Sequence, residues 1–190
     1  MYKRQLLPDV VLPTTPTERA QAQLRREPPV EILPRAQISE MIGLVEAVAD
    51  KEGRADLFEL ALESGRDFGS TLYLVKAAEL LELVDTPRQT VVLTEQGKRF
   101  VAGDINARKK MLNELFAELR IVRLTTNLLR ASPNLHMPAS ELQERISEWL
   151  PNQNPQEQLE TLIAWGRFSE YLGYSDDTKE IYLDVGQETI

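Results

Sequence analysis

The chain has 190 residues, 42% of them hydrophobic, no cysteine and a formal net charge of −8. This length allows one medium domain or two small ones, and the missing cysteines exclude disulfides, zinc–thiolate sites and iron–sulfur clusters. No apolar run approaches the length of a membrane span, and the short basic start lacks a secretory pattern. We therefore expect a cytoplasmic globular protein with no direct membrane insertion.

The charge is unevenly distributed along the chain. Residues 1–36 hold six Lys/Arg and four Asp/Glu, whereas residues 37–190 hold sixteen and twenty-six, which leaves a net charge of −10. The first stretch is also rich in proline and lacks periodicity, so we interpret residues 1–36 as a flexible linker. The acidic body would repel a phosphate backbone, which argues against nucleic-acid binding.

Residues 37–103 are predicted to form a first small module. An apolar stripe at helical spacing opens it, formed by Ile38, Met41, Ile42, Val45 and Val48. Asp56 is positioned to cap a short second helix, and Asp67 or Ser70 starts a third one that we expect to extend for several turns. A short strand at 91–93 follows. A helix followed by a two-stranded ribbon is the closing half of a winged helix.

Residues 104–184 are predicted to form a second module of the same kind. Asp104 opens the longest helix, which we expect to run to about Arg130, and Ser140 begins a capping box for the next helix. A third helix and a hairpin close the module, before a tail at 185–190. The predicted fold class is therefore mainly α with short β wings, in two tandem winged-helix-like modules.

The closing segment of the second module is rich in aromatic residues, although the whole chain is only 6% aromatic. Asn154 and Pro155 supply an N-cap and a proline at the first helical position. A glycine inside a helix costs about 1 kcal/mol relative to alanine. We therefore expect Gly166 to be present because it permits a close approach by another helix. The residues that we single out, as a structural signature or a partner contact, are Trp165, Gly166, Arg167, Phe168, Glu170 and Tyr174.

Two interpretations of this segment stay open. In the structural one, three aromatic side chains lie in the core: Trp165, Phe168 and Tyr171. Arg167 then forms an ion pair with Glu170 or with Asp56. In the functional one, a partner docks around Arg167, Glu170 and the hairpin that follows them.

Several short motifs carry a family resemblance. They are Gly43-Leu44-Val45-Glu46, Gly53-Arg54-Ala55-Asp56-Leu57-Phe58, Ala77-Ala78-Glu79-Leu80-Leu81, Leu93-Thr94-Glu95-Gln96-Gly97 and Ile163-Ala164-Trp165-Gly166-Arg167-Phe168-Ser169-Glu170. The last of them, followed by the hairpin motif Tyr174-Ser175-Asp176, is much more specific than the others. In these motifs, over residues 33–183, the chain resembles the AAA-associated C-terminal domain found behind the ATP-binding subunit of nitrate/sulfonate/taurine-type ABC importers. Ser169 stands where that family usually has Ala.

The resemblance implies a non-catalytic accessory or regulatory domain of a prokaryotic ABC transporter. Its implied partner is an ABC ATPase domain or a transporter subunit, at the inner face of the membrane. It implies no catalytic residue, no cofactor and no metal, and the lone His136 fits a loop between helices. The 190 residues contain no G-x-x-x-x-G-K-[ST] phosphate loop. The nucleotide chemistry of such a parent protein would therefore lie upstream of Met1.

The alternative interpretation is a winged-helix DNA-binding transcriptional regulator. Its candidate recognition helices, at 70–84 and 154–172, carry one Lys with two Glu and one Arg with three Glu. Direct base readout normally uses Arg, Lys, Asn and Gln, and these acidic helices fit it poorly. We therefore expect no nucleic-acid partner. Self-association and the transported substrate stay open.

Overall fold

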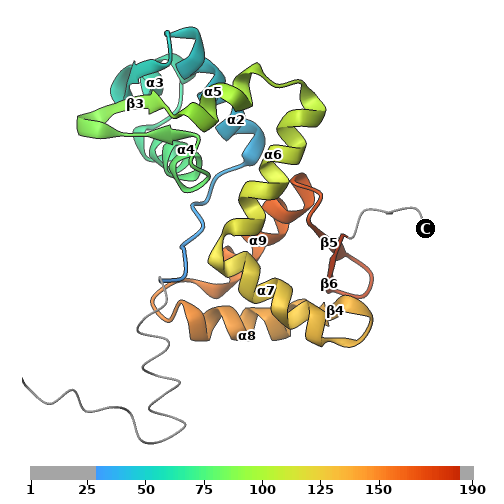
Figure 1. Cartoon of the computed structure of the whole chain (residues 1–190). Coiled ribbons are helices and arrows are strands. Elements are labelled where there is room, and N and C mark those ends of the chain that lie inside the picture. The colour runs from blue at the N-terminus through green and yellow to red at the C-terminus, as the bar shows by residue number, and fades with distance from the viewer. Residues whose placement is uncertain (1–28, 185–190) are drawn as a thin grey trace, which may run out of the picture.

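The computed structural model describes residues 29–184, which form two similar units joined by α5 (Glu95–Ala102) and α6 (Ile105–Glu118) (Figure 1). The first unit contains α2 (Ile38–Asp50), β1 (Arg54–Asp56), α3 (Leu57–Ser64), α4 (Phe68–Leu80), β2 (Val84–Asp85) and β3 (Thr90–Leu93). The second contains α7 (Arg120–Ala131), β4 (His136–Pro138), α8 (Ala139–Trp149), α9 (Pro155–Phe168), β5 (Leu172–Ser175) and β6 (Glu180–Leu183). The predicted fold class is confirmed, because the chain is mainly helical with two small antiparallel sheets.

Both sheets have the same three-stranded order. The strands lie in the order β1-β3-β2 in the first unit and β4-β6-β5 in the second, and all pairs are antiparallel. Buried pairs such as Ala55 with Val91 and Met137 with Ile181 fix the register. The sequence analysis did not predict β1 or β4, and it placed His136 in a loop, although this residue lies on β4.

The third helix of each unit ends in the same way. Glu82 and Glu170 follow α4 and α9 and adopt left-handed backbone conformations, with φ of 55° and 57°. The next amide in each unit donates to the carbonyl five residues before it, at 2.8 and 2.9 Å. This is the Schellman arrangement, which satisfies carbonyls at a helix end. It ends both helices four residues earlier than the sequence predicts.

The long helix predicted from Asp104 to Arg130 is two helices in the structure. The chain leaves helical geometry at Leu119, which has a ψ of 134°, and α7 begins at the next residue. There the Glu31 carboxylate accepts hydrogen bonds from the amides of Arg120 and Ile121, at 3.0 and 3.1 Å. A carboxylate satisfies free amides at a helix N-terminus and is favoured by the helix dipole. The prediction of one continuous helix is wrong because the chain breaks at Leu119, and the side chain that satisfies the amides of the new helix start lies 89 residues before Arg120.

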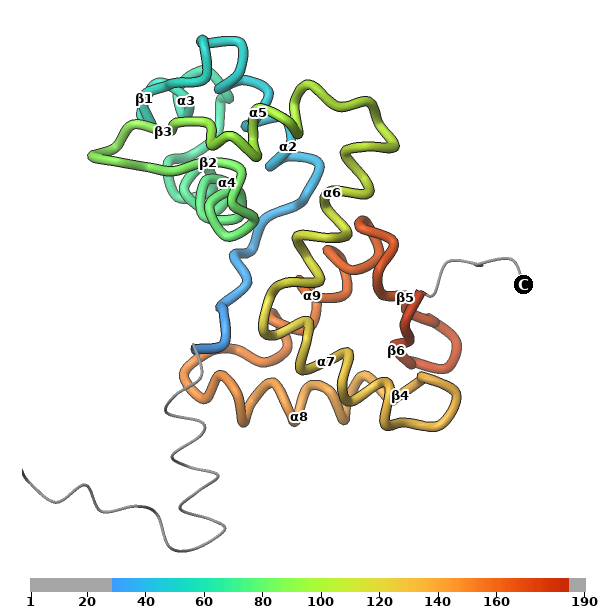
Figure 2. Tube along the Cα trace, viewed as in Figure 1, coloured from blue at the N-terminus to red at the C-terminus, as the bar shows by residue number. Residues whose placement is uncertain are grey.

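Residues 29–36, which we call the strap, pack against the second unit. The Gln158 side chain accepts from the amide of Leu33 at 2.8 Å and donates to its carbonyl at 3.1 Å. The Trp165 indole N–H donates to the Ala36 carbonyl at 2.8 Å. Figure 2 shows this stretch leading from the second unit up to α2. The predicted linker at 1–36 is therefore wrong for the strap, and its remaining residues, 1–28, lie outside the described part.

Helix α6 links the two units. Arg108 donates to the Glu46 carboxylate on α2 and to the carbonyls of Val101 and Gly103, whereas the neighbouring Lys109 pairs with Glu170 after α9. Buried side chains of both units belong to one hydrophobic cluster, which runs through α6. This cluster includes residues on both sides of positions 103 and 104, so it does not divide the chain there. The domain boundary between these two positions stays a prediction.

Most predicted helix starts are confirmed. The side chains that accept the capping hydrogen bonds at these starts belong to Asp56, Asp67, Asp104 and Asn154. Thr94 caps α5 in the same way. The capping box at Ser140 is wrong, because α8 begins at Ala139, directly after Pro138, and has no side-chain cap.

We expect Glu31→Ala to destabilise the chain. The substitution leaves two amides of α7 without their acceptor, and loss of a helix cap typically costs about 0.5–2 kcal/mol. Urea denaturation monitored by circular dichroism measures the change. Glu144→Ala, at an exposed position on α8, is the matched control. Equal stability of the two variants would contradict the capping role.

Candidate protein-binding surface

The six residues singled out from the sequence fall into separate environments. Trp165 is 1% exposed and packs in the core of the second unit. Gly166 is buried beside it, and a Cβ atom there would lie 2.6 Å from the Leu172 Cβ. The glycine therefore permits a close approach, but by strand β5 and not by another helix as predicted.

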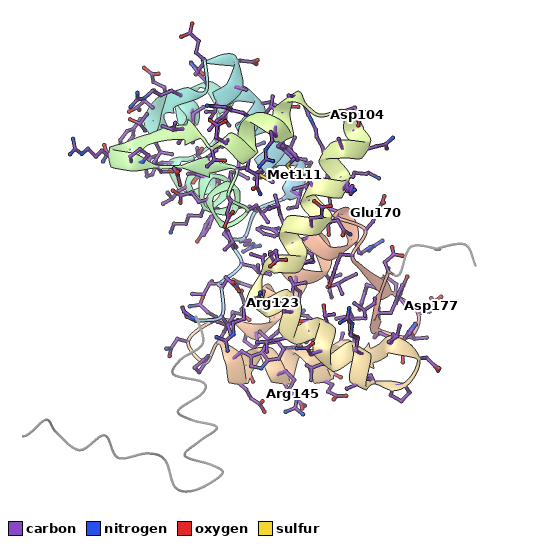
Figure 3. All side chains as sticks on the ribbon, viewed as in Figure 1. Asp104, Met111, Arg123, Arg145, Glu170 and Asp177 are labelled. Carbon is purple, nitrogen blue, oxygen red and sulfur yellow. The ribbon has the colours of Figure 1, made fainter. Side chains whose placement is uncertain are left out.

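Arg167 and Tyr174 line a groove of about 520 Å³ between α8, α9 and the β5–β6 hairpin. The ion pair predicted between Arg167 and Glu170 or Asp56 is wrong. Glu170 pairs instead with Lys109 of α6, and Asp56 caps α3. Figure 3 shows Glu170 at the junction of α9 with α6. The Arg167 side chain is therefore exposed, whereas Glu170, three residues later, is bound to α6.

Apart from Trp165, the aromatic residues of this segment are only partly buried. Phe168 is 38% exposed, so its predicted place in the core is wrong. Tyr171 is half-buried: its hydroxyl lies 3.1 Å from the Thr126 hydroxyl, and its ring meets Phe116 edge-on. These contacts attach α9 and its hairpin to α6 and α7.

A group of neighbouring exposed apolar side chains lies in the first unit. Phe58 and Phe68 are 49% and 41% exposed, and their rings stack with centroids 4.9 Å apart. Leu62, one turn after Phe58 on α3, is 81% exposed. We call these three side chains the α3 patch. Exposed apolar groups that adjoin one another are typical of protein-interaction sites, whereas single ones are common on any surface.

Two aspartates fix the geometry of the α3 patch. The Asp56 carboxylate accepts from the amide of Phe58 at 2.8 Å and starts α3. Asp67 caps α4, whose first residue is Phe68, by accepting from the amide of Ser70 at 3.0 Å. The Ser70 hydroxyl and amide hold the pKa of Asp67 below its ordinary value. The rings of Phe58 and Phe68 therefore both lie in the first turn of a helix whose N-terminus is capped by an aspartate.

The α3 patch was not predicted from the sequence, in which Leu57, Leu60 and Ala61 already supply the buried side of this short helix. Phe58 and Leu62 form a second apolar stripe on the same short helix. A second apolar stripe, outside the buried side of a helix, indicates an interaction surface when its members adjoin one another in the fold. That signal was present in the sequence.

In a DNA-binding winged helix, α4 would be the recognition helix. The face of α4 that carries Tyr73, Lys76 and Glu79 is turned toward the second unit. Tyr73, Lys76 and Glu79 line a cleft of about 780 Å³ together with the strap and with Glu157 of α9. The cleft walls thus carry charges of both signs. In this arrangement, a DNA duplex would have to enter between the two units to reach α4.

Neither metal nor membrane features are found in residues 29–184. No group of three His, Asp or Glu side chains there could hold a metal ion. None of the helices in this range is long and apolar enough to cross a bilayer. His136 stacks on Tyr182 with ring centroids 4.9 Å apart and lies 3.7 Å from the Glu180 carboxylate. Its contacts are those of a strand residue in a small sheet.

Comparison with known proteins identifies the family. Residues 58–175 match the model of the C-terminal AAA-associated domain, and this chain belongs to that family. Membership supports an accessory role. A search of curated proteins finds no match.

Among solved structures, the chain is similar to an N,N-8-amino-8-demethyl-D-riboflavin dimethyltransferase from Streptomyces davawensis. The identity is 17%, the match covers 82% of this chain and 46% of that chain, and the TM-score is 0.28. The chain thus spans less than half the length of that enzyme. A TM-score of 0.28 is too low to indicate a shared fold.

We expect Trp165→Ala to cost about 3–5 kcal/mol of unfolding free energy, as is typical for a large buried aromatic side chain. Trp165→Phe should cost less, because it keeps an aromatic ring in the core and loses only the hydrogen bond to Ala36 and part of the ring volume. Urea denaturation measures the change in both variants. A change below 1 kcal/mol for the alanine variant, on the scale of a surface substitution, would contradict the core role.

The cap at Asp67 predicts a pH-dependent stability. A lowered pKa means that the folded state favours the charged carboxylate, so its contribution is present above the unfolded pKa of about 4 and is lost as the pH falls through the folded pKa. We expect Asp67→Ala to melt at a lower temperature than the wild type at pH 7. The difference should shrink below pH 4. A difference that is constant from pH 7 to pH 2.5 would show that Asp67 does not act through its charge.

Proposed function

We propose that this chain is a non-catalytic accessory domain that works by binding a protein partner. The partner we propose is the ATP-binding subunit of a nitrate/sulfonate/taurine-type ABC importer, at the cytoplasmic face of the membrane. Membership of the AAA-associated family supports the accessory role. The motifs around Trp165 and Tyr174 resemble those found behind this type of ATPase and support the choice of partner.

The observation that carries the proposal is the α3 patch. Stacked phenylalanines beside a highly exposed leucine would be unfavourable in water unless a partner covers them, since each buried aromatic or leucine side chain contributes about 1.5–3 kcal/mol. Binding hot spots are compact groups of this kind surrounded by polar residues. Glu59 and Glu63 provide such polar neighbours on α3. We therefore infer that the α3 patch forms the centre of the partner interface.

The groove around Arg167 and Tyr174 is a second surface that this partner could contact. Its lining includes Glu160, Asp176 and Lys179, so it is polar and carries both charges. Polar rims of this kind affect association rates and selectivity more than affinity. We therefore assign the groove a smaller share of the binding energy than the α3 patch.

We expect Leu62→Ser to weaken binding of a purified importer ATP-binding subunit at least tenfold. Ile105→Ser is the matched control, because Ile105 is also highly exposed, at 76%, but lies on α6 outside the α3 patch. Isothermal titration calorimetry of the wild type and both variants measures the dissociation constants. Arg167→Ala should change the constant by less than Leu62→Ser.

Two results would contradict this assignment. If both serine variants bind as tightly as the wild type, the α3 patch is not the interface. If Arg167→Ala alone abolishes binding, the partner docks on the second unit, as the sequence analysis considered.

The proposal also predicts that the chain binds neither ATP nor duplex DNA. No phosphate loop is present in its sequence, and the net charge of −10 over residues 37–190 opposes the electrostatic attraction on which DNA binding depends. Calorimetry with ATP and magnesium should show no heat of binding. Fluorescence anisotropy with labelled duplex at 150 mM salt should show no sub-micromolar binding. Salt-sensitive, sub-micromolar DNA binding would favour the transcriptional-regulator alternative.

A further inference from the structure

We propose that a groove between α2, α3 and α4 binds an uncharged, mainly apolar small molecule. We call it the α2 groove, and its walls include Gly43 and Leu44 of α2, Leu60 of α3 and Leu74 of α4. Its volume of about 490 Å³ lies in the range of about 300–1,000 Å³ that is typical of small-molecule sites. This binding activity goes beyond the proposed function and does not depend on it.

The floor of the α2 groove is apolar. Leu44, Leu60 and Leu74, one from each of the three helices, are 8%, 4% and 4% exposed. Thr71 lies beside them, and its hydroxyl is already used in a hydrogen bond to the Asp67 carbonyl at 3.2 Å. A ligand that removes this apolar surface from water is stabilised by the hydrophobic effect. The floor therefore favours an apolar ligand.

Gly43 forms part of the α2 wall, and the packing of residues 29–184 does not explain its missing side chain. It lies in the middle of α2 with a helical backbone, where glycine is less favourable than alanine. Among the described residues, no atom outside the adjacent helix backbone comes within 4 Å of the position that a Cβ atom would occupy. At Gly166, by contrast, Leu172 leaves no room for a Cβ atom. A ligand that lies against the bare backbone at Gly43 would account for this glycine.

Ion pairs bound the α2 groove at both ends. Near the start of α2, the Glu40 carboxylate accepts a hydrogen bond from Arg66 at 3.1 Å. Directly after α2, Lys51 donates to Glu63 of α3 at 2.7 Å. A helix of a partner protein is about 10–12 Å wide and could not lie along the groove without breaking these pairs. The bounded space therefore fits a small molecule better than a helix.

The same ion pairs determine the charge of the ligand. Two carboxylates and two cations cancel, and each cation already has a carboxylate partner. A charged ligand would lose water there without gaining an unpaired opposite charge. Ser39 also lines the groove, and its hydroxyl makes no hydrogen bond to another described residue. The site therefore fits a neutral molecule with one polar group, such as a hydroxyl, carbonyl or amine.

The α2 groove and the α3 patch lie on different sides of α3. Successive residues of an α-helix are about 100° apart, which places Leu60 and Ser64 roughly opposite Phe58 and Leu62. Leu60 and Ser64 line the groove, whereas the other two residues belong to the α3 patch. Substitutions can therefore test the two surfaces separately.

Fluorescence titration of the purified chain with N-phenyl-1-naphthylamine tests the site. This uncharged aromatic amine becomes fluorescent in an apolar environment. We expect one saturable site, and at least tenfold weaker binding by Gly43→Leu, whose new side chain would occupy the α2 groove. Asp50→Leu adds a leucine at an exposed position of α2 outside the groove and should bind as the wild type does. Leu62→Ser should also leave binding unchanged, because it alters only the α3 patch.

Two further measurements test the fold of the variant and the charge of the ligand. Gly43→Leu should melt no lower than the wild type, because its Cβ atom meets open space and leucine forms helices better than glycine. The sulfonated analogue of the probe, 8-anilino-1-naphthalenesulfonate, should bind to the α2 groove at least tenfold more weakly than the uncharged probe.

The other outcomes overturn the proposal. Absence of saturable binding to the wild type would show that the α2 groove does not take this class of molecule. Undiminished binding by Gly43→Leu, or loss of binding in Leu62→Ser, would place the probe elsewhere. A lower melting temperature of Gly43→Leu would contradict the open space at Gly43, and tighter binding of the sulfonate would contradict a neutral ligand. No ATP-binding subunit is used, so these results are distinct from a failure of the proposed function.

Discussion

The second unit depends on the hydrogen bonds that the strap makes with α7 and α9. Glu31 caps α7, Gln158 pairs with both backbone groups of Leu33, and Trp165 donates to Ala36. Buried polar groups that lose a partner cost about 1–3 kcal/mol each, so these bonds constrain where the strap can lie. Since α2 begins right after the strap, the same bonds also fix how the first unit enters the fold.

The position of the strap determines which helix faces of the first unit are open to a partner. The strap and α9 face, across a cleft, the side of α4 that a DNA-binding winged helix would use, and the outer side of α3 is left uncovered. Helix α6 holds the units together through Arg108 and Lys109. Within residues 29–184, the uncovered α3 patch is the surface that we propose for the partner, and family membership supports the accessory role.

Local features of the sequence predicted much of the fold. Capping residues such as Asp56 and Asn154 start helices where they were expected, and the apolar stripe from Ile38 marks α2 correctly. These signals act within a few residues, so they can be recognised in one segment. The repeated helix–hairpin order also followed from local patterns, and it gave the correct fold class.

The features that the sequence did not reveal depend on contacts between distant residues. The break at Leu119 needs Glu31, and the strands β1 and β4 are only three residues long and exist through pairing with β3 and β6. The candidate site shows the same division. Trp165 was correctly expected in the core, whereas the partners of Arg167 and Glu170 were predicted wrongly, because an ion pair is decided by which helices meet.

Hydrogen exchange at the strap tests the central claim most directly. The account predicts that the Leu33 amide and the Trp165 indole N–H exchange only through global unfolding, with the same opening free energy as buried amides of α7. Measured by NMR under native conditions, the two groups should then respond to low denaturant as the core does. Exchange at the rate of an unstructured peptide, while the amides of α7 stay protected, would show that the strap does not hold the second unit together.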